Sequence, residues 1–165
     1  MMAYCKEIEL KRKNRGFTLI ELVIVITIIG ILAAMALPRF AALQTEARIA
    51  KMNGALGAIK SAAAMAHAQL LSSNYPSTFT GDPAAPDINI EGVNIRYANG
   101  YPDSRDIAAL AGAIGPDYIL SQSGTQMRIS PDTNHPTCRI IYIDATAATV
   151  VPTYDITGLS QANCS

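Results

Sequence analysis

The sequence predicts an α+β protein in which one long N-terminal helix packs on a small antiparallel β-sheet. Two observations favour this class. A helical pattern covers the first half of the chain, and short runs of alternating apolar and polar residues, separated by turn residues, cover the second half. The 165 residues are enough for one domain with a modest core and too few for two comfortable ones.

The predicted helix opens with an apolar run over residues 17–37, FTLIELVIVITIIGILAAMAL. As a helix this run is roughly 31 Å long, which is enough to cross a hydrocarbon core of about 30 Å. Residues 1–16 carry a net charge of +3, and the rest of the chain carries −3. The positive-inside rule therefore keeps the basic end in the cytoplasm and places everything from Pro38 onward outside.

One carboxylate interrupts the apolar run. Glu21 costs about 2.5–3.5 kcal/mol or more near a bilayer centre, so it requires a partner. A cut after Gly16 would create a cationic amine on Phe17, one helical turn before Glu21. That amine would pair with Glu21 of the same chain or of a neighbouring chain, and a pairing between chains would fix their axial register. The alternative is a solvated carboxylate with no role.

The segment Arg-Gly-Phe-Thr-Leu-Ile-Glu at residues 15–21, with the apolar run behind it, resembles the class III signal of type IV prepilins and pseudopilins. This resemblance implies that prepilin peptidase cuts between Gly16 and Phe17 and methylates the new amine of Phe17. It also implies that Glu21 guides docking into a growing filament. The implied partners are other pilin subunits, the prepilin peptidase, the membrane and an inner-membrane pilus assembly platform.

A different signal fits the same residues. Residues 20–32 are also typical of the apolar region of an ordinary secretory signal, with an A-x-A cleavage site at residues 34–36. The product would be a soluble binding domain beginning at Leu37. Glu21 inside the apolar region and the length of the run argue against this alternative.

The helical pattern resumes after Pro38, which lacks an N–H and should kink the helix, and continues to about Ser73, where Tyr75-Pro76 stops it. His67 on this segment is interpreted as a solvated or satisfied histidine rather than a ligand. The predicted buried stripe consists of Phe40, Leu43, Ala47, Met52, Leu56, Ile59, Ala63, Ala66 and Leu70.

The remaining residues predict a loop and then the sheet. Residues 74–86 are rich in Pro, Ser, Thr and Gly and predict the loop. A turn is expected over 99–102, and a short helix capped by Asp103 or Ser104 should carry Ile107, Leu110 and Ile114 before Gly115-Pro116. Residues 88–90 and 93–97 predict one bulged strand or two short ones around Glu91-Gly92. Further strands are expected over 127–129, 138–144 and 149–154. Pro152 indicates that the last of these is an edge strand.

Three cysteines are present. Cys5 lies in the basic leader, so its removal would leave Cys138 and Cys164, an even count that suits one disulfide in an exported protein. Two free thiols are the alternative. The two cysteines also resemble the disulfide-closed C-terminal region of pilins.

A second resemblance concerns the head. The triplet Gly-Tyr-Pro at residues 100–102 before a short helix, Pro-Arg-Phe at 38–40, and the placement of Cys138 and Cys164 resemble the mannose-sensitive haemagglutinin (MSHA) pilins. Major pseudopilins of type II secretion often end instead in a calcium loop with a Trp-containing motif, and this chain has no Trp.

Motifs for catalysis are missing from the sequence, which has no H-E-x-x-H, phosphate loop, C-x-x-C or G-x-S-x-G. His67 and His135 are too few for a metal triad, and Asp132 is interpreted as a turn residue rather than a calcium ligand. The scattered Arg96, Arg105, Arg128 and Arg139 in a net acidic body favour ordinary ion-pairing arginines over a nucleic-acid surface. The expectation is no enzyme, no cofactor and no metal.

The expected organisation is a leader over 1–16, a transmembrane and filament-core helix over 17–37, its amphipathic continuation over 38–73, and a β head over 74–165. The leading interpretation is a type IV pilus subunit, first in the inner membrane with its N-terminus in the cytoplasm and then in an extracellular filament that supports adhesion or motility. The alternatives are a type II secretion pseudopilin and the soluble secreted domain.

Overall fold

The structure is a computed structural model that describes residues 16–75, 88–147 and 149–165. Most of the predicted leader and most of the predicted loop over 74–86 lie outside these ranges. The chain divides into two compact units, Met1–Arg39 and Phe40–Ser165. The α+β prediction is confirmed: a long helix contributes to both units, and in the second unit it packs on antiparallel strands.

Helix α1 covers Leu19–Ser72 and continues through Pro38. Alanine, the best helix former, recurs along it, and this favours the helix even where the apolar stripe is weak. Its end has a local cause that the sequence analysis missed. Asn74 has a left-handed φ of 54°, and the N–H groups of Asn74 and Tyr75 donate to the carbonyls of Leu71 and Leu70. This pair of bonds is a Schellman motif that satisfies the last carbonyls and turns the chain away.

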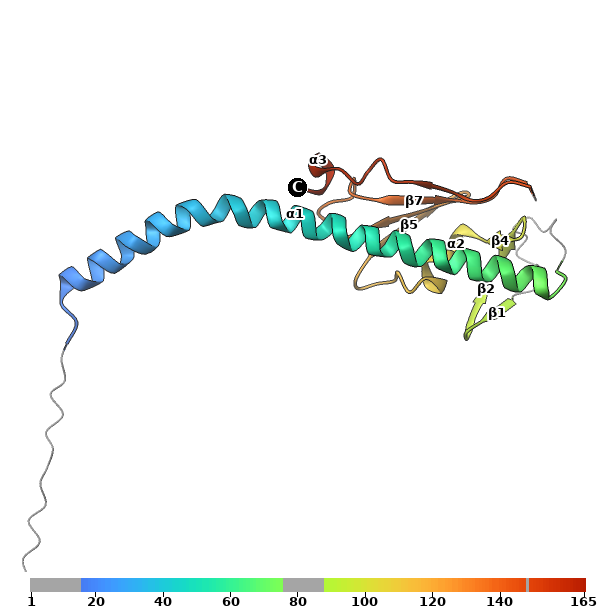
Figure 1. Cartoon of the computed structure of the whole chain (residues 1–165), viewed down its shortest axis with the longest axis horizontal. Coiled ribbons are helices and arrows are strands. Elements are labelled where there is room, and N and C mark those ends of the chain that lie inside the picture. The colour runs from blue at the N-terminus through green and yellow to red at the C-terminus, as the bar shows by residue number, and fades with distance from the viewer. Residues whose placement is uncertain (1–15, 76–87, 148) are drawn as a thin grey trace, which may run out of the picture. The chain divides into compact units, whose positions relative to one another are not determined.

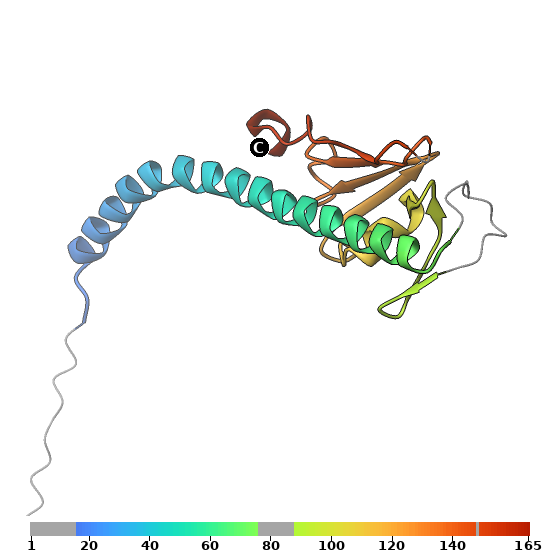
Figure 2. The same cartoon turned by 45° about the vertical axis from the view of Figure 1, so that its right-hand side comes forward.

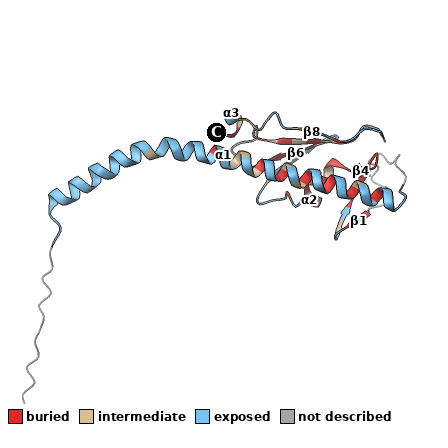
Figure 3. Cartoon of the chain, viewed as in Figure 1, coloured by how far each residue is buried: buried red, intermediate tan, exposed pale blue. Residues whose placement is uncertain are grey.

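The part of α1 in the first unit is apolar on all sides, as predicted. Every described residue up to Arg39 is exposed except the half-buried Ala36, and in Figure 3 almost the whole ribbon of this stretch has the colour of exposed residues. Since soluble proteins rarely expose large contiguous apolar patches, this surface requires lipid or other helices around it. Only this helix, among the described residues, is long and apolar enough to cross a membrane, with a mean hydropathy of 2.8 over its most apolar window.

In the second unit α1 has one buried stripe. The prediction is confirmed for Met52, Ile59, Ala63, Ala66 and Leu70, while Leu56 is half-buried. The prediction is wrong at the start of the stripe. Phe40, Leu43 and Ala47 are exposed, because the core against which α1 packs begins only near Ile49 and Met52. The positions that complete the buried set are Thr45, Ala55 and Ala62.

Two hairpins follow the helix. Strands β1 (Ile88–Ile90) and β2 (Val93–Ile95) pair around Glu91-Gly92, which confirms two short strands rather than one bulged strand. Strands β3 (Tyr97–Ala98) and β4 (Tyr101–Pro102) pair around Asn99-Gly100. In both turns the two central residues have positive φ, the conformation of two-residue hairpin turns. The predicted turn over 99–102 is therefore correct at 99–100, whereas 101–102 form a strand.

Helix α2 covers Ser104–Leu110, and Asp103 is its N-cap, accepting a 2.8 Å hydrogen bond from the Arg105 N–H. The prediction that this helix extends to Ile114 is wrong. Gly112 has a φ of 68°, and the N–H of Ala113 donates to the Ala108 carbonyl, so a second Schellman motif ends the helix early. Ile114 is consequently exposed rather than part of the core.

The main sheet is antiparallel and has the order β5-β6-β7-β8. The predicted strand over 127–129 is confirmed and longer, and the strand over 138–144 is confirmed in its centre. The predicted strand over 149–154 is wrong in its first half, because pairing begins only after Pro152, which has no N–H to donate. The strands are β5 (Ile119–Ser123), β6 (Gln126–Ser130), β7 (Ile140–Ile143) and β8 (Thr153–Asp155), and helix α3 (Gln161–Cys164) follows them.

The core of the second unit lies between α1, α2 and one face of this sheet. Figures 1 and 2 show the second half of α1 beside the strands of the head. Ile140 and Tyr142 share a strand face, and both are fully buried. The hydroxyl of Tyr142 donates to the Pro102 carbonyl at 2.7 Å, so its burial leaves no unpaired polar atom. A second cluster joins the end of α1 to the β1–β2 hairpin.

Gly158, between β8 and α3, has no room for a side chain. A Cβ there would lie 2.6 Å from the Arg139 carbonyl oxygen and 2.7 Å from that of Thr137, both in the backbone before β7. We predict that Gly158→Ala lowers the free energy of unfolding by about 1–3 kcal/mol, as expected for overpacking. Chemical denaturation of the detergent-solubilised chain measures this.

Gly57→Ala is the matched control for that variant. Gly57 lies in α1, and a Cβ there would have no atom within 4 Å. Because alanine favours helix by about 1 kcal/mol over glycine, this variant should be as stable as the parent or more stable. Equal stability of Gly158→Ala and Gly57→Ala would contradict the close approach at Gly158.

Candidate functional site

The predicted cleavage site lies in the non-helical segment before α1. Gly16, Phe17 and Thr18 are all exposed, and Phe17 has 91% of its surface exposed. A Cβ at Gly16 would have no atom within 4 Å, so nothing in the described chain crowds this backbone. Both residues that flank the predicted cut are therefore exposed in the part of the chain that the structure describes.

Glu21 lies in the first turn of α1 and forms a capping box with Thr18. Its Oε2 accepts a 2.9 Å hydrogen bond from the Thr18 N–H and a 2.7 Å bond from the Thr18 hydroxyl, and the Glu21 N–H donates back to Thr18 Oγ1 at 3.3 Å. These reciprocal bonds satisfy N–H groups that the helix start leaves unpaired. Residues 18–21 have the Thr-x-x-Glu pattern that predicts this box, and the sequence analysis missed it.

The capping box places the carboxylate next to the predicted cleavage point. Thr18, which Glu21 binds, directly follows Phe17, the residue that would carry a new amine. Glu21 is exposed, so its carboxylate is accessible to a group from outside the chain. The hydrogen bonds of Glu21 go to Thr18, so its carboxylate is held at the residue that directly follows Phe17.

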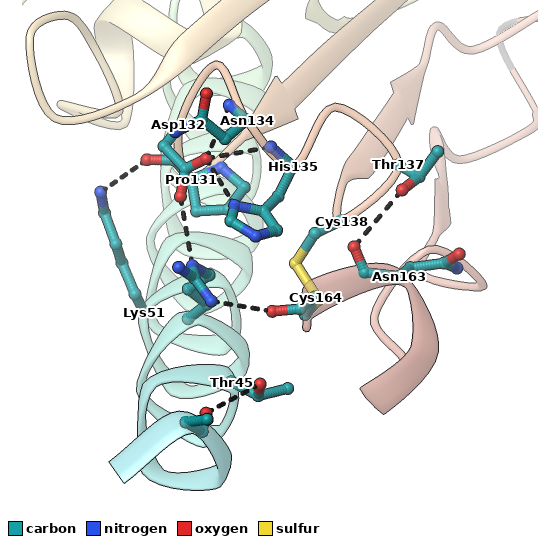
Figure 4. A network of polar contacts seen from close by, with 12 residues as sticks. Thr45, Lys51, Pro131, Asp132, Asn134, His135, Thr137, Cys138, Asn163 and Cys164 are labelled. Atoms are coloured by element: carbon teal, nitrogen blue, oxygen red, sulfur yellow. Dashed lines mark hydrogen bonds and ion pairs between the residues drawn. A yellow bond between two sulfur atoms is a disulfide. The ribbon is translucent and has the colours of Figure 1, made fainter. Parts of the chain in front are cut away.

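The C-terminal region is closed by a disulfide between Cys138 and Cys164, which confirms the predicted pair. Both cysteines are fully buried. Arg48 of α1 donates to the Cys164 carbonyl at 3.1 Å and to Asp132 at 3.3 Å, so the helix, the loop before β7 and the C-terminal helix are joined. Figure 4 shows the disulfide and the contacts of Asp132 with its neighbours.

Asp132 is a turn residue, as interpreted from the sequence. Its Oδ1 accepts from the N–H groups of Asn134 and His135, and the His135 ring nitrogen lies 2.7 Å away. Lys51 adds contacts from α1 to the carbonyls of Asp117 and Pro131. Within the ranges that the structure describes, no group of three or more His, Cys, Asp or Glu side chains is placed to hold a metal ion.

His67 and two of the four arginines have ordinary structural partners. The Nδ1 of His67 lies 2.7 Å from the Gly100 carbonyl oxygen, and its ring stacks on Tyr101 with centroids 4.1 Å apart. Arg96 forms an ion pair with Asp106, and Arg105 forms one with Asp103, each at 2.8 Å. Arg128 and Arg139 instead line a common pocket.

Two buried carboxylates at the N-terminus of α2, Asp103 and Asp144, have pKa values shifted in opposite directions. Asp144 accepts hydrogen bonds from the Ser104 N–H at 2.6 Å and from the Ser104 hydroxyl at 3.0 Å. Burial and the neighbouring negative charge of Asp103 nevertheless raise the pKa of Asp144 to about 6. Burial opposes the ionisation of Asp103 too, but its hydrogen bonds and ion pair with Arg105 outweigh burial and lower its pKa.

These shifts predict a pH dependence of stability. Between the unfolded pKa of 3.8 and the folded pKa of about 6, folded Asp144 binds more protons than unfolded Asp144. The free energy of unfolding should therefore fall as pH rises through this window, by about 2 kcal/mol between about pH 4.5 and about pH 7. Asp103 has the opposite sign, but its contribution is lost only as the pH falls through its lowered folded pKa, below this window.

Asp144→Asn keeps an acceptor for the Ser104 N–H and removes the titration. Denaturation of this variant at both pH values should show about 2 kcal/mol less pH dependence than the parent. Asp117→Asn is the matched control, because Asp117 is exposed, and it should keep the parental dependence. An unchanged slope in Asp144→Asn would contradict the assignment to Asp144.

The N-terminal part of the chain is similar to a known family of segments. Residues 11–37 match the family model of the prokaryotic N-terminal methylation motif. The matched residues include the predicted cleavage point and the apolar run over 17–37.

The relatives are pilus and secretion proteins. The chain is 53% identical over 57 residues to the type IV narrow pilus major component PilA5 of Thermus thermophilus, covering 34% of this chain and 49% of the relative. It is 54% identical over 50 residues to the fimbrial protein EcpB of Eikenella corrodens, covering 30% and 31%. It is also 39% identical over 71 residues to the type II secretion system core protein G of Pseudomonas aeruginosa, covering 43% and 49%.

The similarity spans about half or less of each of these relatives, so it concerns a segment and not the whole proteins. No solved structure matches the chain. The methylation motif and the pilin relatives support a similarity to type IV pilins. They do not favour one branch of the pilins over another.

Proposed function

We propose that the chain is the precursor of a type IV pilin, a structural subunit of a filament. The observation that carries this proposal is the exposed apolar stretch of α1, which has Glu21 in its first turn, shortly after Gly16-Phe17. Such a surface suits a helix that is surrounded by lipid before assembly and by other subunits after it. The matched methylation motif supports the same processing.

The proposed pathway follows from this helix. Prepilin peptidase cuts between Gly16 and Phe17 and methylates Phe17, and the subunit waits in the inner membrane with its head outside. An assembly platform in that membrane then adds the subunit to the filament, where residues 17–37 bundle in the core. Residues 38–73, with a kink at Pro38, connect this core to the head over 74–165.

Within the pilins, we propose a place near the MSHA group. Support comes from residues 100–102, which form the turn and strand before α2, and from the disulfide that closes the C-terminal region. Adhesion, surface attachment or motility would then depend on what the filament touches and on motor proteins outside this chain. No catalytic role is proposed.

The second candidate is a pseudopilin of a type II secretion system. The similarity to core protein G of Pseudomonas aeruginosa favours it, since that match extends over 43% of this chain. The two candidates differ in where the product accumulates. Shearing of whole cells, followed by electron microscopy and immunoblotting, should find this chain in long surface filaments. Retention of the mature chain in the envelope fraction, with secretion lost in its absence, would favour the pseudopilin.

A further inference from the structure

A small pocket opens on the face of the main sheet that points away from α1. Its volume is about 280 Å³. The residues that line it come from β5, β6 and the segment before β7: Ile119, Ser121, Arg128, Ser130, Thr133 and Arg139, together with Asp132 and Pro136.

The strand register explains why these side chains meet. Ser121 of β5 lies opposite Arg128 of β6, and Arg128 lies opposite Ile141 of β7. Side chains two residues apart point to the same face of a strand, so Ser130 shares the face of Arg128. Arg139 directly precedes β7. Met127 and Ile129 point to the opposite face and are buried in the core. Arg128 in β6 and Arg139 before β7 therefore line one pocket.

The two arginines have no carboxylate partner of their own. In the described ranges no ion pair is formed by Arg128 or by Arg139, and the Nε of Arg128 is buried without any hydrogen-bond partner. A buried donor without a partner costs free energy, so such a group points to an acceptor that binds there. The contrast is with Arg96 and Arg105, which each hold an aspartate in a short ion pair.

The nearby acids are already engaged. Asp132 lines the pocket, but its oxygens accept from Arg48, His135 and two backbone N–H groups. Asp155 accepts hydrogen bonds from the hydroxyl and the N–H of Thr157, which lower its pKa, and the charge of Arg139 lowers that pKa further. Neither acid forms an ion pair with Arg128 or Arg139, and these two arginines line the pocket together with the hydroxyls of Ser121, Ser130 and Thr133.

We propose that this pocket binds a tetrahedral oxyanion, a sulfate or phosphate group, through Arg128 and Arg139. The planar guanidinium fork matches two oxygens of such a group, and hydroxyl donors from β5, β6 and the following loop suit the remaining oxygens. The pocket is at the small end of ligand sites, so it has room for one anionic group and a small part of its carrier. The group is either a free inorganic ion or an ester on a sugar.

The test uses the full chain, labelled with nitrogen-15 and solubilised in detergent. The Arg128 Nε–H resonance is the one that disappears in Arg128→Lys. Titration with sodium sulfate should move this resonance in a saturable way, whereas sodium chloride at equal ionic strength should not. Glucose 6-sulfate and glucose then separate the two sources: tighter binding of glucose 6-sulfate than of sulfate indicates a sugar ester, and equal or weaker binding indicates the free ion.

Arg128→Gln and Arg139→Gln should each weaken sulfate binding by about tenfold or more, since each removes charged hydrogen bonds. Lys60→Gln removes one positive charge from an exposed position of α1 outside the pocket, and it should bind sulfate like the parent. Arg139 lies outside the strands, so Arg139→Gln decides the outcome if Arg128→Gln unfolds. A shift that chloride reproduces, or parental binding by Arg139→Gln, would overturn the proposal.

Discussion

Glu21→Ala is expected to leave cleavage after Gly16 intact and to reduce the yield of sheared filaments by about tenfold or more. The reason is the charge that assembly would bury. When one partner of a buried ion pair is removed, the other charge remains unpaired, at a cost of about 3–5 kcal/mol, and each 1.4 kcal/mol is about tenfold in an equilibrium. Filament yield is measured by immunoblotting of the sheared fraction, and cleavage by the mass of the membrane-bound subunit.

Three further variants separate the charge of Glu21 from its capping box. Glu21→Gln keeps an oxygen for the Thr18 N–H and removes the charge, so it should be as defective as Glu21→Ala. Thr18→Ala removes the hydroxyl of the box and keeps the carboxylate, so it should cost only about 0.5–2 kcal/mol of helix stability and preserve filaments. Glu46→Gln changes an exposed carboxylate of the same helix and should assemble normally.

The outcome that would contradict the charge account is specific. If Glu21→Gln forms normal filaments while Thr18→Ala forms few, Glu21 acts through the helix cap alone. The hydrogen bonds of Glu21 with the N–H and the hydroxyl of Thr18 would then account for its role without an ion pair between subunits.

The second large effect is expected for the disulfide. It closes a loop with a sequence separation of 26, so the chain-entropy model predicts that Cys164→Ser lowers the free energy of unfolding by about 3.5 kcal/mol. For a unit that covers Phe40–Ser165, this corresponds to a fall in Tm of roughly 13 °C. Calorimetry of the detergent-solubilised mature chain measures it, and Cys138→Ser should give the same result.

Two comparisons make this prediction specific. Reductant should lower the Tm of the parent to that of Cys164→Ser and should not change the variant further. Cys5→Ser alters only the leader in the proposed precursor, so the mature subunit should be unaffected. A parental Tm that does not respond to reductant would show that the bond contributes little to the stability of the head.

The long helix could be predicted from the sequence because its signals are local. The apolar run over 17–37 and the alanine-rich continuation each favour helix on their own, and the observed span of α1 agrees. The hairpin turns at Glu91-Gly92 and Asn99-Gly100 are equally local, because the chain there needs positive φ. The disulfide followed from a count of cysteines together with the export signal.

The sequence-based predictions fail where tertiary contacts decide whether a segment forms a strand or a side chain is buried. Strand β5 is an exposed edge strand with two serines, and only its pairing with β6 makes it a strand. Phe40 and Leu43 continue an apolar pattern, but none of the described residues covers them. In the proposed filament these residues would face neighbouring subunits, so the pattern would reflect assembly rather than the fold of one chain.

The candidate site was predictable in its parts but not in its geometry. Gly16, Phe17 and Glu21 stand out by residue type and spacing, whereas the bonds between Thr18 and Glu21 required coordinates. The pocket of Arg128 and Arg139 could not be predicted, because these residues are distant in sequence and are brought together by the register of β6 and β7.

The most direct test of the central claim is the intact mass and N-terminal residue of the protein purified from native membranes and from sheared surface material. We expect an N-methylated Phe17 as the first residue and a mass two hydrogens below that of the reduced chain. A soluble product beginning at Leu37 would contradict it, because the apolar helix would then be a discarded signal and no filament core would remain.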